Sequence, residues 1–171
     1  TVSDGSRTDT ATLIITVTGV NDQAPVAVDD PVTLGVTEDT VYTSVTTLVA
    51  NDTDADGDTL TATAGTVATG QGGSVVIATD GSYTYTPLAN FSGTDTVNYT
   101  VSDSAFTDTG TLTITVAAVN DVPVAVDDSV SSGVTEGVAF NSATSLIAND
   151  TDADGDTLAA TEGTFTTGQG G

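Results

Sequence analysis

The sequence contains no Cys and no His, and these two absences exclude several kinds of chemistry. Without Cys the chain cannot form disulfides or thiolate metal sites, and without His it lacks the commonest catalytic base and the usual zinc ligand. Trp and Met are absent too, and aromatic residues make up only 5% of the chain. A packed core must therefore be built from Val, Ile, Leu and Ala with a few Tyr and Phe.

Positive charge is almost missing as well. A single Arg stands against 24 Asp and Glu residues among 171, which gives a formal net charge of −23. Nucleic acid and anionic membrane surfaces are excluded as partners, because neutralising phosphate requires Lys and Arg. No apolar run approaches the roughly 18 residues of a membrane span, so no membrane insertion is expected. Because so acidic a fold repels itself, we expect it to bind cations.

The most informative positive feature is an internal repeat. The stretch ANDTDADGDTL stands at Ala50–Leu60 and again at Ala148–Leu158, an offset of 98 residues. PVAVDD and TGQGG recur with the same offset, whereas TVSD and VND, which precede the linker proline, recur with an offset of 99. We therefore expect the C-terminal strands of one repeat in residues 1–22, a complete repeat in 23–120 and the N-terminal half of a third in 121–171. The chain starts in mid-pattern at TVSDGS, which suggests a window on a longer protein.

Apolar residues alternate with Thr along much of the complete repeat, which is typical of β-strands. The pattern predicts strands at Val32–Thr37, Val41–Val49, Thr59–Ala64, Ser74–Ala78, Tyr83–Thr86, Thr94–Ser102 and Thr109–Val119. No stretch has helical periodicity. Seven short strands in about 98 residues have the size of an immunoglobulin-like sandwich, so we predict an all-β fold of tandem sandwich repeats. Tyr99 is expected either as a tyrosine corner or as a core aromatic residue.

The stretch DTDADGD, at residues 52–58, matches the opening D-x-D-x-D-G of a Ca²⁺-binding loop. Alternate carboxylates in a tight loop point to one side, and hard oxygen ligands suit Ca²⁺. An EF-hand is not expected, since its twelfth position is Thr63 and no helices flank the loop. The candidate ligands in the two copies are Asp52, Asp54, Asp56, Asp58, Asp150, Asp152, Asp154 and Asp156. An Asp-rich surface turn held by its own hydrogen bonds is the alternative.

The order of the acidic motifs resembles that of cadherin repeats. The residues that carry this resemblance are the linker pair Asn21-Asp22, Glu38 in VTED, Asp54-Ala55-Asp56 in the loop, and Asp103 in VSDS. A still closer likeness is to the cadherin-like, VCBS-type repeats of giant bacterial surface proteins, including RTX adhesins. It rests on PVAVDD, ANDTDADGDTL, DGSYTYTP and NFSGTDTVNYTVSD, and it covers essentially the whole chain.

This resemblance implies Ca²⁺ sites shared by neighbouring repeats. At the first junction it assigns Asn21 and Asp22 of the linker and Asp54, Asp56 and Asp103 of the repeat that follows. At the second it assigns Glu38 of the repeat before, Asn120 and Asp121 of the linker, and Asp152 and Asp154 of the repeat after. The linkers depart from the cadherin pattern, with Gly19 and Ala118 in place of the first linker Asp. The number of ions per junction therefore stays open.

Together these features predict a Ca²⁺-rigidified spacer in a repetitive adhesin, extracellular at the bacterial surface or in a biofilm, that projects distal domains. Its partners would be the neighbouring repeats of the same polypeptide. One alternative is a subunit that assembles into fibres by strand exchange, and another is a ligand- or carbohydrate-binding module with aromatic residues exposed at one end. We expect no enzyme, because the carboxylates that could cleave glycosides recur in loops with the repeat.

Overall fold

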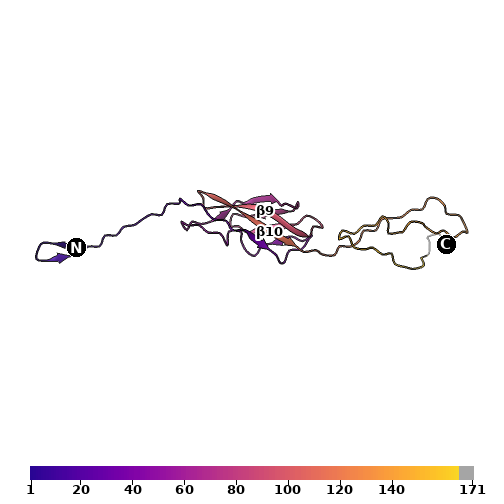
Figure 1. Ribbon diagram of the computed structural model, residues 1–171, viewed down its shortest axis with the longest axis horizontal. Coiled ribbons are helices and arrows are strands. Elements are labelled where there is room, and N and C mark those ends of the chain that lie inside the picture. Colours follow the sequence, from indigo (N-terminus) through magenta and orange to yellow (C-terminus); the bar gives the residue numbers. More distant parts are fainter. Residues whose placement is uncertain (166–171) are drawn as a thin grey trace.

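The structure is a computed structural model and describes residues 1–165, so the second TGQGG stretch, at 167–171, lies outside the described residues. A small N-terminal hairpin, a central β-sandwich and a C-terminal segment follow one another along the long axis (Figure 1). The ten elements assigned in these residues are all β-strands. The predicted all-β fold is confirmed.

The central sandwich consists of two four-stranded sheets. The first has the order β3 (Asp30–Val32), β10 (Thr107–Val116), β9 (Gly93–Ser102) and β5 (Thr61–Ala62). The second has the order β4 (Tyr42–Thr43), β8 (Tyr83–Thr86), β7 (Ser74–Ile77) and β6 (Gly65–Ala68). Neighbours are antiparallel except β3, which runs parallel to β10. The N-terminal hairpin pairs β1 (Val2–Ser3) with β2 (Thr8–Asp9).

The core lies between the two sheets and follows the predicted alternation. In β10 the side chains of Leu112, Ile114 and Val116 are buried, while the Thr residues between them remain at least partly exposed. Val75 and Tyr85 are the fully buried side chains that the second sheet contributes to the core. Because each strand gives every second side chain to one face, the Thr-rich positions form the outer surfaces of the sandwich.

Strand limits differ from the prediction mainly in the first half of the repeat. Strand β8 has the predicted limits, but β4 keeps only two residues of the predicted Val41–Val49, and β6 was not predicted. Gly35 has a positive φ of 80°, so the backbone turns within the predicted strand Val32–Thr37. Strand length was overestimated because apolar alternation persists through turns.

Side chains, together with an isolated backbone bridge between Val26 and Thr53, hold the start of the complete repeat. We call residues 25–30 the strap. The Ala27 N–H donates to Asp108 Oδ2 at 2.9 Å, and the Val28 N–H donates to Asp52 Oδ1 at 2.8 Å. Asp29 Oδ1 in turn accepts the Thr111 N–H at 2.8 Å. These carboxylates supply acceptors for strap and strand N–H groups, which fixes the chain just after the linker.

Tyr99 also binds the strap through its hydroxyl group. Its hydroxyl lies 2.7 Å from Asp30 Oδ2 and 3.0 Å from the Val28 carbonyl, and it donates towards both. A tyrosine corner would instead bond to backbone a few residues upstream. Tyr99 is thus a buried core residue that joins β9 to the strap. Burial and the Asp30 carboxylate raise the pKa of its hydroxyl.

A second buried carboxylate, Asp95 in β9, organises the first TGQGG stretch. Asp95 Oδ2 accepts hydrogen bonds from the hydroxyls of Thr69 and Tyr85, and Oδ1 accepts the N–H groups of Gln71 and Thr96. Four donors satisfy this buried group, which would otherwise be costly to bury. These bonds attach the first TGQGG stretch to β9.

Candidate metal centre

The first acidic loop folds around the carboxylate of Asp54. Its Oδ1 accepts the backbone N–H groups of Asp56 at 2.9 Å and of Asp58 at 3.1 Å. Gly57 has a φ of 78°, the left-handed conformation that the tight turn requires. Carboxylate oxygens of Asp54, Asp56 and Asp58 all lie within 4.8 Å of one another. The loop therefore gathers three acidic side chains at one point.

The second loop has the same geometry. Asp152 Oδ1 accepts the N–H groups of Asp154 at 3.0 Å and Asp156 at 3.2 Å, and Gly155 has a φ of 77°. Its three carboxylates also lie within 4.8 Å of one another. Only an isolated bridge, Val124 with Thr151, pairs the backbone in the described part of this copy. The loop conformation is thus a local property of its sequence.

Each loop also receives N–H groups from the linker in front of it. Asp56 Oδ2 accepts the N–H groups of Asp22 at 3.0 Å and Gln23 at 2.9 Å. Asp154 Oδ2 accepts the N–H of Asp121 at 2.6 Å in the same way. A linker and a loop more than 30 residues apart in sequence are therefore joined at both junctions.

The first junction contains buried oxygen atoms without hydrogen-bond partners among the described residues. They are Asn21 Oδ1, Asp54 Oδ2 and Asp103 Oδ2. Asp103 is 3% exposed, and its other oxygen accepts the N–H groups of Ala105 and Phe106. The Phe106 N–H is the main reason that the pKa of Asp103 is lowered, which favours the charged form. A buried oxygen without a partner costs about 1–3 kcal/mol, and a bound cation would remove that cost.

Glu38 stands early in the sequence of the complete repeat, but in space it lies beside the residues that lead into the second linker. It is 3% exposed, its N–H donates to the Ala117 carbonyl at 3.1 Å, and its Oε1 accepts the Val119 N–H at 2.6 Å. These bonds place a buried carboxylate next to the residues that start the linker. Glu38 therefore lies beside the second linker, and its role as a ligand stays a prediction.

The linker residue Asp121 lies among acidic residues from both sides of the second junction. Its Oδ2 is buried and has no partner in the described part of the chain. Burial raises its pKa most, followed by repulsion from Asp39, Asp154 and Glu38. Asn120 bonds its side-chain amide to the Asp121 carbonyl at 2.9 Å. A cation bound among these carboxylates would relieve their mutual repulsion.

Asp39 is an acidic residue that the sequence reasoning did not single out, and its charge adds to the repulsion on Asp121. It follows Glu38 directly in VTED, and its Oδ1 accepts the Asn90 N–H at 3.0 Å. The only sequence signal was its position beside a predicted ligand. In the next copy the corresponding residue is Gly137, so acidity at this place is not a constant of the repeat.

Asp52 and Asp150 lie beside the carboxylate groups and not within them. Asp52 Oδ1 holds the Val28 N–H of the strap, and Asp150 Oδ1 holds the Val126 N–H at the same distance of 2.8 Å. Burial raises the pKa of Asp52, and the Asp108 carboxylate raises it further. These bonds account for one carboxylate oxygen of each residue, whereas Asp52 Oδ2 is buried without a hydrogen-bond partner among the described residues. The role of both residues as ligands stays a prediction.

The donor set suits a hard cation. Every candidate ligand is a carboxylate or an amide oxygen, and Ca²⁺ takes six to eight such oxygens in a tolerant geometry. The structure brings together Asn21, Asp54, Asp56, Asp58 and Asp103 near the first linker, with Asp22 contributing its backbone N–H. At the second junction it brings together Glu38, Asp121, Asp152, Asp154 and Asp156, with Asn120 beside them. These residues fit Ca²⁺, and their role as ligands stays a prediction.

Comparison with known proteins identifies the family. The model of the bacterial Ig domain matches residues 21–115 and 120–171. The chain belongs to the bacterial Ig domain family. The predicted tandem immunoglobulin-like fold is thereby confirmed, while the narrower likeness to cadherin-like and VCBS-type repeats stays a prediction. No curated protein matches the chain.

Among solved structures the chain is similar to parts of two endo-fucoidan hydrolases from glycoside hydrolase family 107. For MfFcnA4 the identity is 25%, the TM-score 0.42, and the match covers 60% of this chain and 15% of that one. For MfFcnA9 the identity is 24%, the TM-score 0.40, and the coverage 58% and 17%. The chain thus matches less than a fifth of either protein, and likenesses this weak assign no activity to it.

These neighbours correct the expectation that no enzyme is involved. That expectation came from acidic loops that recur with the repeat, whereas the solved chains with a similar part are hydrolases. The expectation is therefore withdrawn, and no activity is assigned to this chain. In residues 1–165 no helix is long and apolar enough to cross a membrane.

Proposed function

We propose that this bacterial Ig-family chain is a Ca²⁺-stiffened spacer segment of a repetitive bacterial surface protein. The observation that carries the proposal is the repeated bond from linker to loop, Asp22 to Asp56 and Asp121 to Asp154. Each linker is fastened to the repeat that follows, and acidic residues of both neighbours surround it at the second junction. A cation there would tie one repeat to the next.

Electrostatic repulsion among the carboxylates would make the rigidity of the junction depend on Ca²⁺. Without a cation, Glu38, Asp121 and Asp154 repel one another, which favours conformations that separate the two repeats. With Ca²⁺ bound, the same carboxylates attract a shared ion and fix the angle between neighbours. At millimolar Ca²⁺, about tenfold over a Kd of roughly 10⁻⁴ M, linkage amounts to about 1.4 kcal/mol per site. That free energy is modest for folding but sufficient to decide whether a junction is rigid.

The wider setting follows from this chemistry. Extracellular Ca²⁺ modules bind in the range of about 10⁻⁴–10⁻³ M, so such a spacer works outside the cell, where Ca²⁺ is plentiful. The spacer would hold distal domains of an adhesin of the RTX or VCBS type away from the cell surface. Its partners are the neighbouring repeats of the same polypeptide. The alternative of a carbohydrate-binding module has little support, because Tyr83, Tyr85 and Tyr99 are buried and Phe106 is the one exposed aromatic residue of the complete repeat.

Calorimetric Ca²⁺ titration of the whole chain tests the proposal. Wild type should bind Ca²⁺ at both loops, and the double variant Asp54→Asn/Asp56→Asn should lose the binding at the first. The matched control is Asp80→Asn, which also removes an acidic residue but lies in the β7–β8 turn, where its carboxylate bonds only to Ser82. Unchanged stoichiometry in the double variant, or an equal loss in the control, would refute a role for the loops in Ca²⁺ binding.

A further inference from the structure

The first and last segments of the complete repeat lie side by side and run in the same direction. Strand β3 pairs parallel to β10, and further along a parallel bridge joins Thr37 to Ala117. We call the two paired segments, residues 27–38 and 108–119, the seam. Bonded partners along it are 80–82 positions apart from one end to the other, so the register is nearly constant.

Carboxylate side chains make the bonds at both ends of the seam. At the end nearer the first linker, the Ala27 N–H donates to Asp108 Oδ2, and Asp29 Oδ1 accepts an N–H of β10. The Ala27 N–H is the main reason that the pKa of Asp108 is lowered, which favours the charged form. At the other end the Val119 N–H donates to Glu38 Oε1 at 2.6 Å. Because bonds to an ionised acceptor are stronger than bonds between neutral groups, the seam is reinforced where it begins and ends.

Each of these three carboxylates recurs in another copy of the sequence. The counterparts of Asp108, Asp29 and Glu38 are Asp9, Asp127 and Glu136. Asp39, whose carboxylate makes none of the seam bonds, is replaced by Gly137. Acidic residues are thus kept at the positions that bond across the seam.

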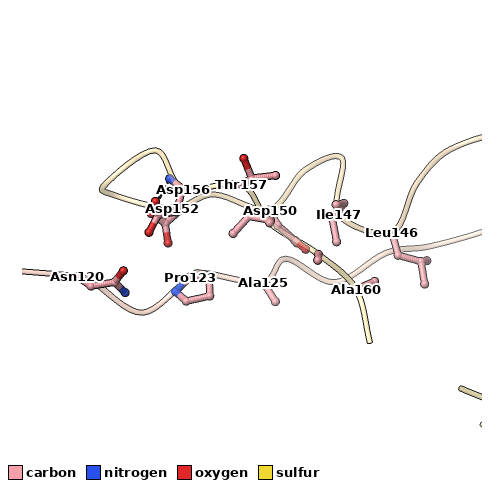
Figure 2. A pocket seen from close by; sticks show the side chains of 12 residues that line it. Asn120, Pro123, Ala125, Leu146, Ile147, Asp150, Asp152, Asp156, Thr157 and Ala160 are labelled. Carbon is pink, nitrogen blue, oxygen red and sulfur yellow. Dashed lines mark hydrogen bonds between the residues drawn. The ribbon is translucent and has the colours of Figure 1, made fainter. Parts of the chain in front are cut away.

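Tension on the chain passes through the seam. The chain enters the sandwich at one end of its long axis and leaves at the other (Figure 1). Figure 2 shows Asn120 and Pro123 on the chain that leaves the seam, opposite Asp152 of the second acidic loop. Because the two segments are parallel, pulling on both linkers slides them past each other. Hydrogen bonds lie across the strands, so all of them resist this sliding together, whereas a hairpin pulled at its open end loses them one by one.

We propose that the seam bears the tension on the repeat, and that Asp108, Asp29 and Glu38 carry part of this load through their side chains. The buried Leu112 and Ile114 of β10 hold the seam against the core. This role goes beyond the proposed spacer. Ca²⁺ at a junction would set the angle between repeats, whereas the seam sets the tension that one repeat withstands. The seam needs no cation, because each of its bonds joins two groups of the protein.

Pulling single molecules in EGTA tests the proposal, because the direction of the load can be chosen. Pulled from its two ends, the chain should show one main unfolding event that releases about 30 nm, the length of roughly 95 extended residues less the folded length. Thr94 and Thr115 are paired near the open end of β9–β10. The chain has no Cys, so handles on Thr94→Cys/Thr115→Cys would open this pair bond by bond, at a clearly lower force. Equal unfolding forces in the two directions would overturn the proposal.

Asp108→Ala tests the side-chain bonds. It removes the acceptor of the Ala27 N–H, so under constant load from the chain ends it should unfold about tenfold faster than wild type. With the handles at positions 94 and 115, the same substitution should have little effect. Asp108→Asn keeps an acceptor oxygen without the charge and should lie between wild type and Asp108→Ala.

The matched control is Ile77→Val, which leaves a cavity in the second sheet and touches no bond of the seam. Urea unfolding of both variants gives their loss of general stability. For a given shift of the urea midpoint, Asp108→Ala should accelerate unfolding under load much more than Ile77→Val. Acceleration in the same proportion to the urea shift would show that Asp108 contributes only general stability, and would refute its part in bearing load. All four Tyr residues lie in the complete repeat, so near-ultraviolet circular dichroism verifies folding.

Repeating the pulling experiment in Ca²⁺ separates the seam from the proposed spacer. The higher unfolding force along the chain should already be present in EGTA. A high force that appears only in Ca²⁺ would refute a seam that bears load without a cation and would leave the spacer in place. A high force in EGTA, together with junctions that Ca²⁺ does not stiffen, would support the seam and refute the spacer.

Discussion

The N–H of Asp121 donates to the carboxylate of Asp154 at 2.6 Å, across the 33 residues that separate linker from loop. Asp22 and Asp56 make the corresponding bond one repeat earlier. Both bonds fasten a linker to the repeat that follows it. The preceding repeat reaches the second linker through Glu38, whose buried carboxylate accepts the Val119 N–H. Rigidity across the junction then depends on what joins Glu38 to Asp121.

Replacing Asp154 with Ala should free the second linker. The variant removes the acceptor of the Asp121 N–H, so that amide should exchange its hydrogen with solvent about tenfold faster or more. Amide exchange followed by NMR measures the change. Asp128→Ala is a control in the same segment, with an exposed carboxylate outside the loop. Equal acceleration by Asp128→Ala would contradict a specific bond from linker to loop.

Glu38 offers a way to separate a structural role from a ligand role. Glu38→Gln keeps an oxygen that can accept the Val119 N–H but removes the charge, so it should weaken Ca²⁺ binding and preserve folding in EGTA. Glu38→Ala removes both, and the free energy of unfolding should fall by about 1–3 kcal/mol. Urea unfolding followed by Tyr fluorescence, together with Ca²⁺ titration, measures the two effects. If both variants lost the same free energy of unfolding and the same Ca²⁺ affinity, the structural role and the ligand role of Glu38 would not be separable as proposed.

Gly110 in β10 is required by the ring of Tyr99. A Cβ at this position would lie 2.4 Å from the Tyr99 hydroxyl oxygen, too close for any side chain. Gly110→Ala should therefore displace Tyr99 from the strap and destabilise the repeat by about 1–3 kcal/mol or more. Thermal unfolding measures the loss. Gly19→Ala, with nothing within 4 Å of the added Cβ, should have no measurable effect.

Stability in EGTA should depend on the ionisation of Asp30. Burial raises the pKa of this carboxyl above its usual value of 3.8, although the Tyr99 hydroxyl opposes the shift. The folded state then binds the proton more tightly than the unfolded state, so this contribution to stability is complete below pH 3.8 and is lost as pH rises through the folded pKa. Asp30→Asn, which can still accept the Tyr99 hydroxyl, should be more stable than wild type at pH 7. The difference should shrink as pH falls, and a difference independent of pH would contradict the assignment.

The features that the sequence predicted well are local or repeated. The two acidic loops have the expected form because Asp54 and Asp152 bond to N–H groups two and four residues later, without help from a sheet. Strands β8 and β9 were predicted to within one residue because their alternation is bounded by clear turn signals.

The features that were missed depend on contacts between distant segments. Asp108 fastens the strap and Asp95 clips the TGQGG turn, each through residues more than 20 positions away. Neither role has a motif, since each depends on the register in which β9 and β10 meet the rest of the sandwich. Asp39 acts on Asp121 through its charge, although the two residues are far apart in the sequence. No pattern in a single sequence specifies such an arrangement.

Small-angle X-ray scattering of a two-repeat protein with complete second domain, in Ca²⁺ and in EGTA, tests the proposed spacer most directly. With Ca²⁺ the particle should be extended and rigid, with one maximum dimension. In EGTA repulsion among Glu38, Asp121 and Asp154 should leave the two repeats free to reorient, with a broader distribution of dimensions. Asp121→Asn/Asp154→Asn should abolish the response to Ca²⁺. Scattering that is identical in Ca²⁺ and EGTA for the wild type would contradict a spacer stiffened by Ca²⁺.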